Sequence, residues 1–120
     1  IYKFGTFAVR AKEKEEADQL LKDAEQLQEI GCFGIVLEKI PAVLAAKVAK
    51  SVKIPVIGIG AGNKVDGQVL VLHDFLGMNQ DFSPRFLRRY LNLNHEIQNA
   101  VKKYINDVKN SDFPNENEQY

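Results

Sequence analysis

The sequence predicts an α/β fold with a parallel sheet, because two short apolar runs flank a segment with helical spacing. The first run covers residues 32–38 and ends in Glu38, and the second, residues 56–60, leads into a glycine-rich loop. The segment between them follows Pro41, a residue that suits the first turn of a helix. Strand, helix and strand at this spacing is typical of a parallel β–α–β unit.

A longer helix is expected before the first run, over residues 13–30. Its apolar residues recur at spacings of three and four, which is the helical period. Glu13, Glu15 and Glu16 crowd its first turn, where the helix dipole favours acids, and Gly31 suits its end.

Alternation along a strand separates its side chains into two faces. The first run divides into Gly34, Val36 and Glu38 against the larger Phe33, Ile35 and Leu37. The second run divides in the same way into Val56, Gly58 and Gly60 against Ile57 and Ile59. We expect the larger residues to lie under covering helices and the smaller ones to share the inner face of a curved sheet.

A third strand is expected at residues 68–74, after a loop at 61–67. Alternation with Val69 and Val71 would turn His73 toward the inner face. A final helix is predicted over residues 94–108, and the polar residues 110–120 are predicted to form a tail.

Composition excludes several classes of protein. The 120 residues carry no net formal charge, which argues against a dedicated nucleic-acid binder. Cys32 is the only cysteine, so neither an internal disulfide nor a cysteine-based zinc cluster can form. No apolar run approaches the roughly 18–20 residues that span a bilayer, and a cytoplasmic protein is expected. The start at Ile1 indicates a sequence that begins inside a longer chain.

Three parallel strands are too few to enclose a core, since an open sheet of this size leaves both edges unpaired and one face uncovered. In a (β/α)₈ barrel the other strands supply the missing layer. We therefore predict part of a TIM barrel over residues 1–109, followed by the tail at 110–120. A compact three-stranded αβα layer is the alternative.

Three long motifs, in the same order, resemble the C-terminal part of the ketopantoate hydroxymethyltransferase family. They are VLEKIP (36–41), IPVIGIGAG (54–62) and DGQVLVLHDFLG (66–77), with FPNENEQY (113–120) at the end. The resemblance implies a (β/α)₈ barrel of which this chain would supply the last three strands with their helices.

The resemblance also implies a reaction. Glu38 matches the family's general base, which removes a proton from 3-methyl-2-oxobutanoate so that the resulting enolate attacks a one-carbon unit and gives 2-dehydropantoate, in pantothenate biosynthesis. Mg²⁺ and the donor 5,10-methylenetetrahydrofolate are implied, with the metal ligands on strands absent from this chain, which alone would be inactive. Gly60 and His73 are expected to line the substrate pocket, and a homo-oligomer, commonly a decamer, is implied.

Alternatives remain for the site and for the function. Glu38 could be a surface acid at a strand end, paired with Lys39. The chain could belong to a related barrel of the phosphoenolpyruvate mutase and isocitrate lyase type, acting on another 2-oxo acid. It could also be a non-catalytic module whose loop at 58–62 binds a phosphorylated ligand, because glycines let backbone amides approach an anion.

Overall fold

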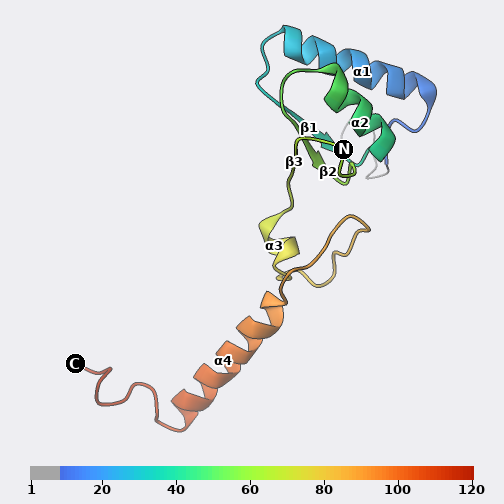
Figure 1. Cartoon of the computed structure of the whole chain (residues 1–120). Coiled ribbons are helices and arrows are strands. Elements are labelled where there is room, and N and C mark those ends of the chain that lie inside the picture. The colour runs from blue at the N-terminus through green and yellow to red at the C-terminus, as the bar shows by residue number, and fades with distance from the viewer. Residues whose placement is uncertain (1–8) are drawn as a thin grey trace. The chain divides into compact units, whose positions relative to one another are not determined.

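The computed structural model describes residues 9–120, which divide into two compact units between Leu70 and Val71 (Figure 1). The first unit contains α1 (Lys14–Glu29), β1 (Ile35–Glu38), α2 (Ala42–Ser51), β2 (Val56–Ile59) and β3 (Gly67–Gln68). The second unit contains α3 (Leu72–Phe75) and α4 (Leu93–Lys109).

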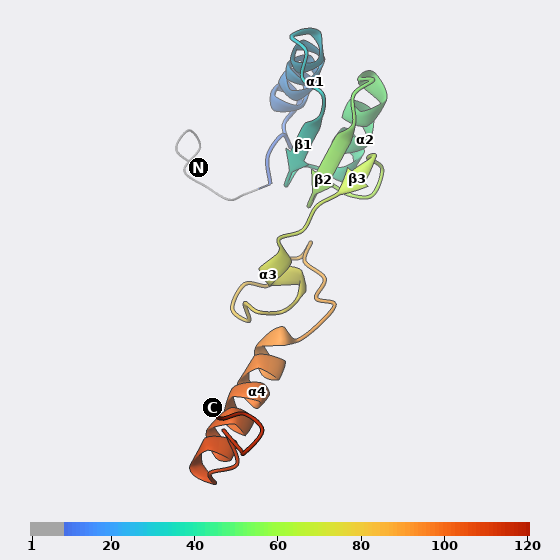
Figure 2. The same cartoon turned by 90° about the vertical axis from the view of Figure 1, so that its left-hand side faces the viewer.

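The three strands form one parallel sheet in the order β1-β2-β3. Ile35 pairs with Val56 and Glu38 with Ile59, so β1 and β2 end side by side. Figure 2 shows the three strands of the sheet next to one another. The predicted parallel α/β arrangement is confirmed, whereas three strands neither require nor exclude a closed barrel.

α1 begins and ends within one residue of its predicted bounds, and α2 begins where Pro41 indicated. α1 has Glu15 and Glu16 in its first turn, and the chain leaves it through Gly31 with a φ of 93°. α2 begins directly after Pro41, whose carbonyl oxygen accepts hydrogen bonds from the amides of Leu44 and Ala45.

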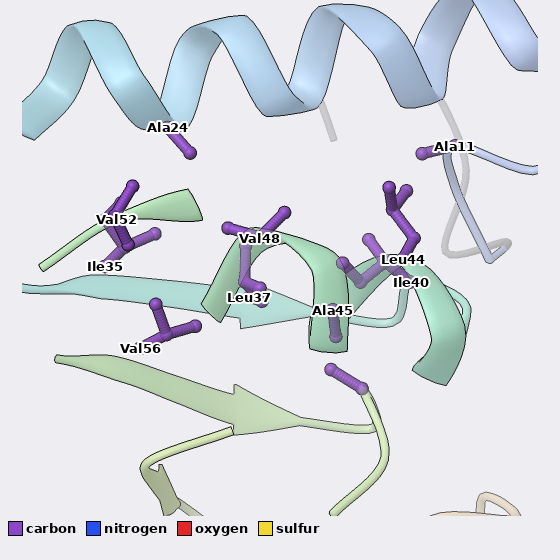
Figure 3. Close-up of a cluster of buried hydrophobic side chains, with 11 residues drawn as sticks. Ala11, Ala24, Ile35, Leu37, Ile40, Leu44, Ala45, Val48, Val52 and Val56 are labelled. Carbon is purple, nitrogen blue, oxygen red and sulfur yellow. The ribbon is translucent and has the colours of Figure 1, made fainter. Parts of the chain in front are cut away.

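The core of the first unit lies between these two helices and one face of the sheet (Figure 3). Val48 of α2 and Val56 of β2 are fully buried at its centre. Ala24 faces it from α1, where a small side chain lets the helix approach closely. On β1 the buried residues are Ile35 and Leu37, as the alternation predicted.

The predicted faces of the second strand are wrong. The register places Val56 beside Ile35 and Gly58 beside Leu37, so both lie on the buried, helix-covered face. Ile57 and Ile59 occupy the opposite face and are half-buried. The reason is geometric, since residues paired across parallel strands point to the same side of the sheet whatever their size.

Phe33 also departs from its expected position under the helices. It precedes β1 in a bend and is 94% exposed, because the strand begins only at Ile35.

The predicted third strand is mostly wrong. Only Gly67 and Gln68 pair with β2, and residues 72–75 form the short helix α3. The last helix is confirmed within one residue at each end, as α4. Its apolar stripe stays 41–56% exposed: Ile97, Val101, Tyr104, Ile105 and Val108.

Contacts within the second unit join α3 and the loop after it to the segment that precedes α4. The amide of Tyr90 donates to the Phe75 carbonyl at 2.8 Å, and the two rings meet edge to face with centroids 6.2 Å apart. Arg89 donates through Nη2 to the carbonyl oxygens of Asn79, Gln80 and Phe82, which fixes the intervening loop. Among the described helices, none is long and apolar enough to cross a membrane.

Candidate functional site

Glu38 is the last residue of β1 and is exposed on the sheet face that the helices leave open. Just beyond it, the amide of Lys39 donates to the Ile59 carbonyl at 2.9 Å, so the β1–β2 ladder continues past the carboxylate. Lys39 has a φ of 51°, and its carbonyl accepts a hydrogen bond from the amide of Arg10. These bonds hold the backbone under Glu38 in place on both sides.

The surface beside Glu38 is apolar. Val36 stands two residues earlier on the same strand and is 63% exposed, and the half-buried Ile57 and Ile59 lie next to it on β2. A carboxylate at the carboxyl edge of an apolar sheet face can accept a proton from a substrate carbon lying over that face. Within the described residues the side chain of Glu38 is exposed to solvent.

The glycine-rich loop follows β2 at the same edge of the sheet. Gly60 lies directly after the strand, with a φ of 64°. Gly62 has a φ of 81°, and a Cβ there would lie 2.4 Å from the Cβ of Ala42, the first residue of α2. Packing of the loop against α2 therefore accounts for Gly62 without any ligand.

Asp66 anchors this loop, a role that the sequence reasoning missed. Its carboxylate accepts a hydrogen bond from the Val56 amide at 2.8 Å, and its own amide donates to the Val56 carbonyl at 2.9 Å. Gln68 adds a hydrogen bond to the Gly62 carbonyl at 2.8 Å. The signal available in the sequence was the Asp66–Gly67 pair, which marks a turn but does not say what the carboxylate binds.

His73 does not occupy the expected strand end. It lies in α3 and is exposed, so strand alternation does not apply to its direction. It also belongs to the second unit, whereas Glu38 and Gly60 belong to the first. The structure brings Glu38 and the glycine loop to one edge of the sheet, and it places His73 in a helix of the second unit.

A magnesium site is not formed by the residues that the structure describes. Within residues 9–120 no group of three or more His, Cys, Asp or Glu side chains is placed to hold a metal ion. Cys32 is a free, half-buried cysteine. The His, Cys, Asp and Glu side chains of residues 9–120 therefore do not form a magnesium site by themselves.

Comparison with known proteins adds to this geometry. The family profile described as "Ketopantoate hydroxymethyltransferase" matches residues 1–116. Two proteins are each 68% identical to the chain over all 120 of its residues. Both are named 3-methyl-2-oxobutanoate hydroxymethyltransferase, and they come from Flavobacterium johnsoniae and Parabacteroides distasonis. A protein of the same name from Porphyromonas gingivalis is 66% identical. The chain spans 44% of the length of each. By its sequence, the chain belongs to the ketopantoate hydroxymethyltransferase family.

Proposed function

We propose that this chain forms part of the catalytic barrel of a 3-methyl-2-oxobutanoate hydroxymethyltransferase and that Glu38 is its general base. The observation that carries the proposal is the position of Glu38, at the carboxyl end of a parallel strand on the face opposite α1 and α2. In a (β/α)₈ barrel that face becomes the interior, and active sites lie at the carboxyl ends of the strands.

The chemistry requires a base at this place. The substrate carries a hydrogen on the carbon next to its carbonyl group, and the Glu38 carboxylate would accept that proton. The electron pair left behind gives an enolate, whose carbon forms a bond to the one-carbon unit of 5,10-methylenetetrahydrofolate. Both C–N bonds of that methylene carbon break, and the oxygen of a water molecule becomes its hydroxyl group. The two folate nitrogens take up the proton held by Glu38 and the proton released from water, which gives 2-dehydropantoate and tetrahydrofolate. The apolar neighbours Val36, Ile57 and Ile59 would keep bulk water from the reacting carbon.

Other parts of the enzyme belong to the same proposal. A magnesium ion would polarise the substrate carbonyl, and its ligands would come from strands of the barrel other than β1, β2 and β3. Residues 1–109 would complete the barrel with those strands, residues 110–120 would form the tail, and whole subunits would assemble as a homo-oligomer. Within the second unit, the guanidinium group of Arg89 donates hydrogen bonds to three backbone carbonyl oxygens.

A chimeric enzyme tests the proposal. In it, the chain replaces the matching 120 residues of the Flavobacterium johnsoniae relative. Glu38→Gln keeps the size and polarity of the side chain but removes the base, so kcat should fall roughly 10²–10⁴-fold. Glu38→Asp, which retains a carboxylate on a shorter stem, should lose less. The measurement is the rate of 2-dehydropantoate formation at saturating substrates.

Glu25→Gln is the matched control, because Glu25 is an exposed acid on α1. It should leave kcat unchanged. Glu38→Gln with wild-type kcat, in a chimera that folds and turns over, would remove Glu38 from the role of base.

A further inference from the structure

A basic groove lies on the side of α2 that faces away from the core, and it includes Ala42, which is four residues after Glu38. It has a volume of about 330 Å³ and is lined by three small or apolar residues, Ala42, Val43 and Ala46, and by three lysines, Lys47, Lys50 and Lys64. Lys64 comes from the glycine-rich loop, which packs closely on Ala42 because Gly62 has no side chain. The groove is therefore built from two segments that pack together.

The positions of the lysines on α2 form a row. Val43, Lys47 and Lys50 follow one another at spacings of four and three, which places them on one helix face. The row extends about 10 Å along the helix at a rise of about 1.5 Å per residue. The N-terminal end of this row lies near the candidate base Glu38. Ala42, the first residue of α2, is four residues from Glu38, so the two Cα atoms are at most about 14 Å apart.

The stretch of sequence that supplies the groove contains no acidic residue. Residues 39–65 contain five lysines and neither aspartate nor glutamate. The three groove lysines are exposed, and within residues 9–120 none of them forms an ion pair. The first turn of α2 has no side-chain cap, so its free amides add to the positive potential at the N-terminal end of the row. This surface is complementary to an extended chain of carboxylates.

We propose that the groove binds the oligo-γ-glutamyl tail of the folate donor, an inference that rests on the proposed function. Each added γ-linked glutamate leaves one α-carboxylate free, so the tail is a flexible row of negative charges. With the one-carbon unit near Glu38, the tail would leave the barrel mouth past Ala42 and pass the lysines in turn. The alkyl stems of Lys47 and Lys50 and the exposed side chain of Val43 would contact its methylene groups.

The test compares donors with one and with five glutamates in the chimeric enzyme. The KM for the pentaglutamate should be lower than that for the monoglutamate, and the difference should shrink as salt screens the charges. Replacing Lys47, Lys50 and Lys64 together by Gln should raise the KM for the pentaglutamate about tenfold. The KM for the monoglutamate and the kcat with either donor should stay unchanged.

The control variant replaces Lys12, Lys14 and Lys22, three exposed lysines at or before α1, by Gln. It loses the same net charge and should leave both KM values as they are. The inference is overturned if the groove variant keeps the preference for the pentaglutamate or if the control loses it equally. It is also overturned if the groove variant changes only the oligomeric size, since another copy of the chain would then cover the groove. A chimera inactive even with the monoglutamate would instead contradict the proposed function.

Discussion

At the scale of single residues, the glycines of β2 and of the loop that follows it meet different neighbours. A Cβ at Gly58 would lie 3.1 Å from Cγ2 of Val65, and a Cβ at Gly62 would lie 2.4 Å from that of Ala42. The sequence suggested a phosphate cradle or an open pocket wall for this loop. Close packing on α2 explains why Gly62 must be small, and it keeps Lys64 near the helix.

Gly62→Ala should therefore destabilise the first unit by about 3 kcal/mol, because it adds a clash with α2 to an unfavourable positive φ. Gly31→Ala provides the control, since Gly31 has a similar φ of 93° but no atom within 4 Å of a new Cβ. It should cost only about 1 kcal/mol. Urea unfolding followed by circular dichroism measures both. Equal losses for the two variants would show that the contact with Ala42 does not constrain the loop.

At the scale of secondary structure, prediction succeeded where a periodic pattern was long. α1 and α4 each present several turns of apolar residues at helical spacing, and both were located within one residue. β1 and β2 were located as short apolar runs, and their parallel pairing is confirmed. The position of Glu38 at the exposed end of β1 followed from alternation along that strand alone.

Prediction of secondary structure failed where an apolar run was too short to show a strand or a helix period. In residues 68–74 an apolar run of strand length predicted a strand, yet Val71 and Leu72 are exposed and the helix α3 begins at Leu72. Periodicity cannot distinguish a short strand from a short helix over so few residues. The faces of β2 failed for another reason, because pairing with β1 decides them and side-chain size does not.

The β3 strand is held by few interactions, and Asp66 supplies one of the strongest. Asp66→Ala removes the hydrogen bond to the Val56 amide and should cost about 1–2 kcal/mol. Because β3 is only two residues long, its pairing should open first. Hydrogen exchange should therefore accelerate at the Val69 amide, which donates to Gly58, more than at Lys39, which donates to Ile59.

Asp23→Ala is the control for this effect. Asp23 accepts a hydrogen bond only on the exposed surface of α1, from Gln19 at 2.7 Å. Loss of the Asp23 carboxylate should leave the rate of hydrogen exchange at the Val69 amide nearly unchanged. If the Val69 amide exchanged as slowly in Asp66→Ala as in the unchanged chain, the pairing of β3 would not depend on the Asp66 carboxylate.

At the scale of the whole molecule, apolar surface remains uncovered in both units. Val36 is 63% exposed on the open face of the sheet, and Tyr104 is 56% exposed on the stripe of α4. Apolar surface of this extent on a short chain is typical of a face that packs against further structure. The chain spans 44% of the length of its relatives, so the remainder of such a protein has ample residues to cover the sheet.

The 120-residue chain alone should form no detectable 2-dehydropantoate from 3-methyl-2-oxobutanoate, 5,10-methylenetetrahydrofolate and Mg²⁺. Its described residues include the proposed base Glu38 but no group of metal ligands, and they do not enclose a substrate over Val36 and Ile59. Orientation of the reactants and metal activation supply most of the acceleration in such a reaction, and a lone carboxylate replaces neither. The chimera with the Flavobacterium johnsoniae relative, assayed in parallel by product chromatography, should be active because it restores the other strands. Turnover by the isolated chain at a rate near that of the chimera would mean that Glu38 works without a closed barrel, and the proposed architecture of the site would be wrong.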